Sequence, residues 1–121
     1  STSSSVRECL DNLIMSNTMR MREVGMSKTL AKEVGKDNIL VNVIGPGRIG
    51  TDRITSLNAM RAEKAGISVE EYETEDLKSF PMGRYGTVDE YGRMAAFLCS
   101  AANTYISGQT ILVDGAMTGA Y

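Results

Sequence analysis

The sequence predicts an α/β fold that contains part of a parallel sheet. Its apolar patterns follow the order helix, strand, helices, strand, which is typical of parallel α/β domains. The first strand, residues 39–44, is an almost continuous run rich in β-branched residues, as expected of a strand buried on both faces. Only two strands are predicted in 121 residues, and a parallel pair of that size is marginally stable alone. We therefore expect one α/β unit over residues 1–121 that represents part of a larger sheet.

Local signals predict where the first elements begin and end. A helix is expected over residues 12–34, because apolar residues return to one side of it and Gly35 then supplies a stop signal. After the first strand, Thr51 or Asp52 is expected to cap a helix that reaches Ala65.

Two more helices and a second strand follow. Each helix begins with a capping box, a Ser or Thr followed three residues later by Glu: Ser68 with Glu71, and Thr87 with Glu90. These helices are expected to end near Lys78 and Ser100. The last strand is Thr110–Val113, closed by the turn dipeptide Asp114-Gly115.

Composition excludes several classes of function. The net charge of −2 gives no basic footprint for nucleic acid or a membrane surface, and no apolar run approaches the ~20 residues of a membrane span. The absence of histidine excludes Ser-His-Asp triads and histidine metal sites, and no metal site is expected. Cys9 and Cys99 stand 90 positions apart and match neither a zinc pattern nor a disulfide scaffold. They predict a reduced, cytoplasmic protein.

A glycine-rich loop, Gly45-x-Gly47-x-x-Gly50, follows the first strand and precedes a helix. A dinucleotide-binding fingerprint has this context, but it also requires a second strand that ends in an acidic residue about 20 positions later. Residues 66–72 instead form the start of an acidic helix, so this interpretation fails. A plain strand-to-helix turn that needs glycine for a positive φ is an alternative.

Motifs of another kind occur in a fixed order along the chain. They are Leu30-Ala31-Lys32-Glu33; Val41-Asn42 followed by Pro46-Gly47 and Thr51; Pro81 with Arg84, Gly86 and Glu90; Tyr105-Ile106-Ser107-Gly108; and Val113-Asp114-Gly115. Together they resemble the short-chain dehydrogenase/reductase family, and most of all its β-ketoacyl-carrier-protein reductases. The resemblance implies a Rossmann-like doubly wound parallel sheet, of which this chain is the C-terminal part.

The resemblance also implies a cofactor, NAD or NADP. The segment Pro46-Gly47 would lie beside the nicotinamide, with Ile49 offering backbone groups to the carboxamide and Thr51 a hydroxyl to the same region. The family's glycine-rich pyrophosphate loop has no counterpart in these 121 residues. We therefore expect the isolated chain to bind the cofactor weakly or not at all.

By the resemblance, two of the family's catalytic residues, the tyrosine and the lysine, are replaced here. Its Tyr-x-x-x-Lys pair corresponds to Ser16 and Arg20, and its catalytic serine corresponds to Ser5. A serine hydroxyl is a far weaker acid than a tyrosine, and arginine cannot be deprotonated to relay a proton. Tyr72 and Tyr85 flank the expected substrate loop, where either could replace the missing acid or simply pack.

Two functions follow from these expectations. The first is an oxidoreductase acting on a small carbonyl or alcohol substrate, including 3-oxoacyl-like ones, which the intact segment from Pro46 to Thr51 favours. The second is a noncatalytic member or fragment used for assembly or ligand binding, which Ser16 and Arg20 favour. In both cases the expected partner is a second copy, giving a homo-oligomer, or the absent N-terminal half.

Overall fold

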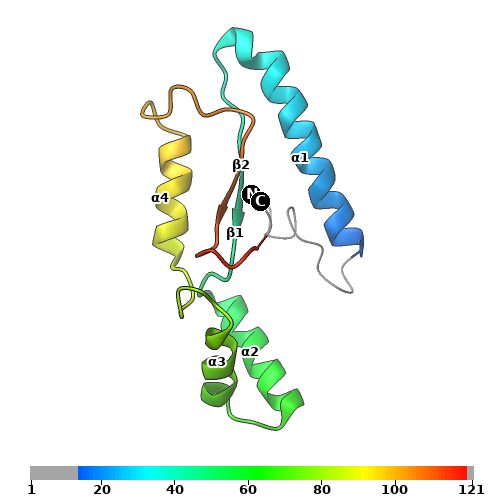
Figure 1. Ribbon diagram of the computed structural model, residues 1–121, viewed down its shortest axis with the longest axis vertical. Coiled ribbons are helices and arrows are strands. Elements are labelled where there is room, and N and C mark those ends of the chain that lie inside the picture. Colours follow the sequence, from blue (N-terminus) through cyan, green and yellow to red (C-terminus); the bar gives the residue numbers. More distant parts are fainter. Residues whose placement is uncertain (1–13, 120–121) are drawn as a thin grey trace.

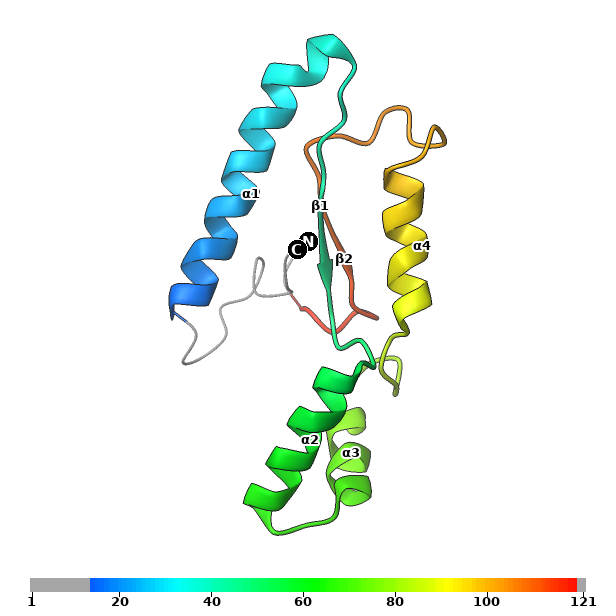
Figure 2. The same ribbon diagram turned by 180° about the vertical axis from the view of Figure 1, so that it is seen from behind.

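The computed structural model describes residues 14–119. Within them two parallel strands, β1 (Val43–Pro46) and β2 (Thr110–Val113), pair in one small sheet. Two helices, α1 (Ile14–Val34) and α4 (Val88–Leu98), flank this sheet on its two sides (Figures 1 and 2). The predicted alternation of helices with parallel strands is therefore confirmed.

The remaining two helices form a hairpin beyond the carboxyl end of the strands (Figure 1). They are α2 (Asp52–Ala65) and α3 (Val69–Lys78), and they pack mainly on each other. The chain leaves α2 at Gly66, whose φ of 70° lies in the left-handed region that glycine adopts without a steric penalty. The loops that join this hairpin to β1 and to α4 meet at the carboxyl end of the sheet.

The first strand begins later than the sequence predicts. Residues 39–44 were expected, whereas β1 starts at Val43. Side chains replace part of the backbone pairing just before β1. The Val41 amide donates to Ser107 Oγ at 3.1 Å, and Asn42 Nδ2 donates to the Ile106 carbonyl at 2.7 Å, while the Val41 carbonyl accepts from the Gly108 amide at 2.6 Å. Asn42 is therefore a satisfied structural polar group, and it lies just before β1.

The strand also ends later than predicted, because it includes Gly45 and Pro46. Proline has no N–H to contribute to a sheet. Here the next residue, Gly47, donates the last bond of the pairing to the Val113 carbonyl at 3.0 Å. The missing donor of Pro46 therefore does not interrupt the sheet.

The helix ends combine confirmed and corrected predictions. Helix α1 ends at Val34 as expected, but a short 3-10 turn, η2 (Gly35–Asp37), follows it. The left-handed residue is Asn38, with φ of 59°, and not Gly35. Asparagine tolerates this conformation better than most side chains, so it can end the turn without glycine.

The two predicted capping boxes differ in the structure. At α4 the box is complete, since Thr87 Oγ1 accepts from the Glu90 amide and the Glu90 carboxylate accepts from the Thr87 amide. At α3 only half is present: Ser68 Oγ accepts from the Glu71 amide at 3.1 Å. Helix α4 ends at Leu98, two residues before the predicted end.

The described part of the chain has a thin apolar core. Ala31 and Ala62 are its buried apolar residues, whereas large side chains on and near α1 stand exposed: Met21, Met26, Leu30 and Ile39, at 52%, 63%, 43% and 52%. Such exposure fits a sheet that is only partly represented in this chain. No helix among residues 14–119 combines the length and apolarity needed to cross a membrane.

Candidate cofactor site

The loop that leaves β1 approaches the turn after β2 very closely. A Cβ on Gly47 would lie 2.6 Å from both Cα and Cβ of Asp114, so no larger residue fits without moving backbone. Gly47 is not among the glycines with positive φ. The glycine is thus required by this close approach, and the alternative interpretation of a turn that needs positive φ is wrong for this position.

Asp114 is held in place by the turn it closes. Its carboxylate accepts from the Ala116 amide at 3.1 Å and from the Thr118 amide at 3.0 Å. The predicted turn Asp114-Gly115 is confirmed, with Gly115 at φ of 63°. This rigid turn fixes one wall against which the loop after β1 rests.

The same loop pairs with the segment before α4 through an isolated parallel bridge between Ile49 and Gly86. The Gly50 amide donates to the Gly86 carbonyl at 2.8 Å, and the Gly86 amide donates to the Arg48 carbonyl at 2.9 Å. In a parallel bridge the residue between these two bonds directs its own N–H and C=O to the opposite side. Within the described chain, these two groups of Ile49 have no hydrogen-bond partner. Ile49 therefore presents one donor and one acceptor at a free edge.

Thr51 is the N-cap residue of α2, as predicted, but its side chain does not act as the cap. Its carbonyl accepts from the Ile54 and Thr55 amides at 2.9 and 3.0 Å, while its hydroxyl makes no capping bond. At the starts of α3 and α4, by contrast, Ser68 and Thr87 both use their hydroxyls as caps. The exposed Thr51 hydroxyl is available to a ligand at the positive end of a helix.

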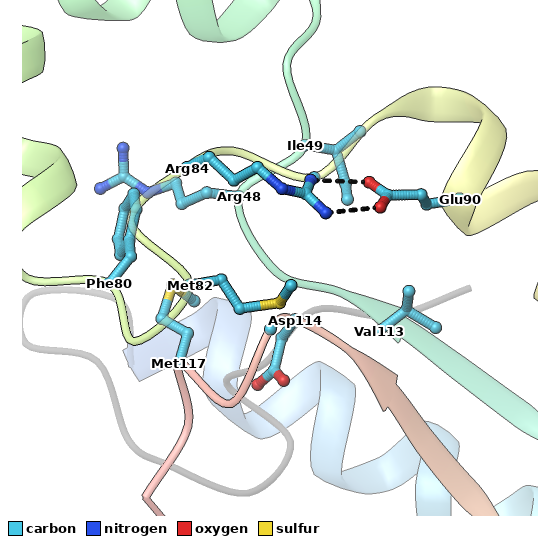
Figure 3. A pocket seen from close by; sticks show the side chains of 11 residues that line it. Arg48, Ile49, Phe80, Met82, Arg84, Glu90, Val113, Asp114 and Met117 are labelled. Carbon is cyan, nitrogen blue, oxygen red and sulfur yellow. Dashed lines mark hydrogen bonds and ion pairs between the residues drawn. The ribbon is translucent and has the colours of Figure 1, made fainter.

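A charged pair orders the segment that carries Gly86. Arg84 donates two hydrogen bonds to the Glu90 carboxylate, at 2.7 and 3.0 Å (Figure 3). This pairing and the amide of Thr87 lower the pKa of Glu90 to about 2, and the pKa of Arg84 is raised by the same bonds. The residues Arg84, Gly86 and Glu90 of the predicted motif thus build the support of the Ile49 bridge.

A cavity of about 130 Å³ lies between these loops, beside Arg48, Met82 and Met117 (Figure 3). Its charged lining groups already have partners: Arg48 with Asp76, Arg84 with Glu90, and Asp114 with its turn amides. The cavity therefore offers packing space between fixed loops. The free polar groups belong to the backbone of Ile49 and the hydroxyl of Thr51.

The two tyrosines near the loop are engaged in hydrogen bonds. The Tyr85 hydroxyl donates to Asp76 Oδ2 at 2.9 Å, and the Tyr72 hydroxyl accepts from Arg61 Nη1 at 3.4 Å. Burial, followed by the bond to Asp76, raises the pKa of Tyr85 above its ordinary value. A raised pKa and an existing bond to Asp76 both disfavour Tyr85 as the replacement acid considered from the sequence.

None of the three predicted catalytic positions, Ser5, Ser16 and Arg20, belongs to the loops described above. Ser16 and Arg20 lie four residues apart on α1, which places them on one side of the helix. Ser5 and Cys9 lie outside the described residues. Among residues 14–119, no three side chains of His, Cys, Asp or Glu are grouped to hold a metal ion.

The partners that support the loop after β1 are not predictable from the sequence. Gly86 was recognised only as part of a motif, and its pairing with Arg48 and Gly50 could not be deduced from spacing. Asn58 and Asp76, which bond to Tyr85, carry no sequence signal at all. They lie far apart along the chain and meet only because α2 folds back on α3.

Known proteins resemble this chain in sequence over most of its length. A family model described as enoyl-(acyl carrier protein) reductase matches residues 2–118. The chain is 44% identical over 94 residues to the 3-oxoacyl-(acyl-carrier-protein) reductase FabG of Chlamydia trachomatis, covering 78% of this chain and 34% of that protein. It is 34% identical over 104 residues to the NADPH-dependent reductase BacG of Bacillus subtilis, covering 86% of this chain and 40% of that protein.

Solved structures with a similar fold point to a related family. A solved structure of a short chain dehydrogenase family protein from Francisella tularensis matches with a TM-score of 0.89 at 28% identity, covering 97% of this chain and 48% of that chain. The chain spans well under half the length of the curated relatives named above. Its two strands and flanking helices are part of a Rossmann-like α/β fold. The chain belongs to the short-chain dehydrogenase/reductase family.

Proposed function

We propose that the protein to which this chain belongs is an NAD(P)-linked oxidoreductase that acts on a small carbonyl or alcohol substrate. The observation that carries the proposal is the free edge at Ile49, where an N–H and a C=O stand unpaired beside the unused hydroxyl of Thr51. A primary carboxamide has one acceptor and two donors, so it complements this set. Loops at the carboxyl end of a parallel sheet border the crevice in which such ligands bind.

The residues present fit the nicotinamide end of the cofactor. Ile49 would hold the carboxamide through its backbone, Thr51 would add its hydroxyl, and Pro46-Gly47 would bring the loop close to the ring. When bound, the cofactor supplies the hydride; the chain's part is to bind and orient it. NADPH is the form to test first, because BacG is NADPH-dependent by name. A 3-oxoacyl thioester is the substrate class to test first, because FabG is a 3-oxoacyl reductase by name.

The proton needed for carbonyl reduction has no obvious donor in this chain. Ser16 and Arg20 stand at the positions of the family's tyrosine and lysine, and Ser5 stands at its serine. A serine hydroxyl offers no comparable proton at neutral pH. Arg20 could still hold a ribose or a carboxylate through its fork of donors.

This replacement supports a second candidate, a noncatalytic family member that binds the cofactor or serves in assembly. The oxidoreductase and a noncatalytic member that binds the cofactor share the site at Ile49 and differ in whether they turn over substrate. They are distinguished with the longest natural chain that carries this sequence, by titrating NADPH fluorescence and then following NADPH oxidation with a 3-oxoacyl thioester. Binding with turnover supports the oxidoreductase, and binding without turnover supports a noncatalytic member that binds the cofactor. Absence of NADPH binding contradicts both of these and leaves only a noncatalytic member used in assembly.

The isolated 121-residue chain is expected to behave differently. It has no glycine-rich loop for the pyrophosphate, so its affinity for NAD(H) or NADP(H) should be millimolar or weaker, roughly −4 kcal/mol. Low-micromolar affinity measured by calorimetry would contradict this expectation.

We further infer that the chain works as part of an oligomer or together with the missing half of the fold. The support is the exposed apolar surface on and near α1, formed by Met21, Met26, Leu30 and Ile39. The second edge of β1 also lacks a strand within the described residues. Sedimentation that gives a stable monomer of 13.1 kDa at micromolar concentration would contradict the inference. The expected compartment is the cytoplasm, since the two cysteines form no predicted disulfide framework.

A further inference from the structure

Five side chains join the α2–α3 hairpin to the loops at the carboxyl end of the sheet. We call them the Tyr85 cluster: Arg48, Asn58, Glu73, Asp76 and Tyr85. Asn58 Nδ2 donates to Glu73 Oε1 and to the Tyr85 hydroxyl oxygen, both at 3.1 Å. The Tyr85 hydroxyl donates to Asp76 Oδ2 at 2.9 Å, and Arg48 Nη1 reaches the same oxygen at 3.4 Å. The Tyr85 hydroxyl thus connects α2 to α3 from a third segment of the chain.

The cluster is shielded from water. Asn58 is fully buried, and the side chains of Asp76 and Arg48 are only 14% and 27% exposed. The side-chain oxygen of Asn58, Oδ1, has no hydrogen-bond partner in the described structure. The two bonds from Nδ2 are therefore the hydrogen bonds that this buried side-chain amide makes. A buried polar group that loses its partner is destabilised by its full desolvation penalty. Removing the Tyr85 hydroxyl would therefore disturb both helices of the hairpin.

The cluster is linked directly to the bridge that orients Ile49. Tyr85 precedes Gly86 and Arg48 precedes Ile49, so the cluster holds the residue before each partner of the bridge. A ring contact strengthens the link: the Arg48 guanidinium lies 5.9 Å from the centre of the Phe80 ring, and Phe80 meets Tyr85 edge-on at 5.7 Å. The place of the hairpin and the orientation of the Ile49 backbone are therefore coupled.

We propose that Tyr85 is a positioning residue for the cofactor: its hydroxyl holds Asp76, which in turn holds Arg48, so that the free N–H and C=O of Ile49 stay aligned. This inference rests on the proposed function, in which Ile49 binds the nicotinamide carboxamide. A purely structural role, in which Tyr85 only ties α2 to α3, would change stability without changing cofactor affinity.

The chain offers a matched control in Tyr72. Its hydroxyl accepts from Arg61 Nη1 at 3.4 Å and so also links α3 to α2. Within the described residues it makes no bond to the loop after β1 or to the segment before α4. Tyr72→Phe and Tyr85→Phe therefore each remove one hydroxyl that is hydrogen-bonded to the α2–α3 hairpin, but only Tyr85 lies next to a residue of the bridge.

The test uses the longest natural chain carrying this sequence, in wild-type form and with each tyrosine replaced by phenylalanine. Tyr85→Phe should weaken NADPH binding by about tenfold, which is 1.4 kcal/mol, and raise KM for NADPH equally. KM for the carbonyl substrate should stay within about twofold. The amides of Gly50 and Gly86, which donate across the bridge, should exchange hydrogen about tenfold faster. Tyr72→Phe should leave all these quantities within about twofold.

Equal effects of the two variants, or a lower melting temperature of Tyr85→Phe with unchanged NADPH affinity and exchange, would overturn the proposal. Asp76→Asn provides the same test if Tyr85→Phe does not fold, since it keeps an acceptor for Tyr85 while removing the charge that faces Arg48. It should change the same quantities in the same direction and by less. Wild-type protein that does not bind NADPH would reject the proposed function, while hydrogen exchange at Gly50 and Gly86 would still decide whether Tyr85 holds this loop.

Discussion

The two ends of the small sheet differ in whether their polar groups are hydrogen-bonded within the chain. At the amino end, the side chains of two asparagines bond to the backbone of the loops. Asn42 bonds to the Ile106 carbonyl and the Gln109 amide, and Asn103, only 6% exposed, bonds to Leu98 and to both backbone groups of Ile106. All of these bonds stay within the chain. The polar side chains at this end therefore stabilise the fold.

At the carboxyl end, polar groups are held in place but left unpaired. The Ile49 backbone and the Thr51 hydroxyl are surrounded by ordered segments, yet they have no partner within the described residues. Unpaired polar groups on a rigid support are typical of a binding surface. This difference between the ends is the reason for proposing that Ile49 and Thr51 serve a ligand, whereas Asn42 and Asn103 serve the fold.

The largest expected effect comes from introducing, at positions 16 and 20, the tyrosine and lysine of the family motif. Replacing Ser16→Tyr and Arg20→Lys in the longest natural chain should raise ketone reduction by about 100-fold or more, because general acid catalysis contributes about 100- to 10,000-fold. The rate is measured together with NADPH affinity, since the second change also removes a fork of donors. If the parent already reduces ketones well and the double variant is slower, Ser16 and Arg20 form a working site of another kind.

Filling the close contact between the loop and the turn should disrupt the support of the carboxyl end. Gly47→Ala places a Cβ 2.6 Å from Asp114 backbone and should lower the free energy of unfolding by about 1–3 kcal/mol. Gly86→Ala is the control, because its Cβ would meet the flexible Cδ1 end of Ile49 at 2.8 Å, which can move. Urea unfolding compares the two. A loss from Gly86→Ala as large as that from Gly47→Ala would contradict this account.

One pair of substitutions separates the two ends directly. Asn103→Ala leaves buried backbone groups unpaired and should destabilise the protein by about 1–3 kcal/mol with unchanged NADPH affinity. Thr51→Ala removes no capping bond, so stability should hold within about 0.5 kcal/mol, while NADPH affinity falls roughly 3- to 10-fold. Thermal melts and fluorescence titrations of both variants give the result. The comparison between the ends is wrong if Thr51→Ala mainly changes the melting temperature.

The smallest effect concerns the Arg84–Glu90 pair and pH. The pKa of Glu90 falls from 4.5 to about 2 on folding, so its ionised form stabilises the native state. This stabilisation is fully present above pH 4.5 and is lost as pH falls toward 2. Glu90→Gln should therefore be less stable than wild type at neutral pH, and the difference should shrink through this window. A difference in melting temperature that stays constant from pH 5 to pH 2 would argue against the pairing.

Local structure was largely predictable because its signals lie within a few residues. The capping box of Thr87 and Glu90, the break at Gly66 and the strand Thr110–Val113 all occur as predicted. Hydrogen bonds between a side chain and an amide three residues away do not depend on the rest of the fold. The bounds of β1 were mispredicted because apolar character shows what can be buried and not where a partner strand begins.

The sequence by itself determined the α/β order, the starts of α2, α3 and α4, and the motifs around Pro46, Thr51 and Arg84 that mark the family. Tertiary structure decided the rest: that Gly47 is a glycine because Asp114 approaches it, that the Ile49–Gly86 bridge leaves Ile49 unpaired on one side, and that Tyr85 joins Asn58 to Asp76. The physical reason is the sequence separation of the residues that interact. Caps and turns are set by neighbours along the chain, whereas close contacts and free hydrogen-bonding edges arise only when distant segments meet.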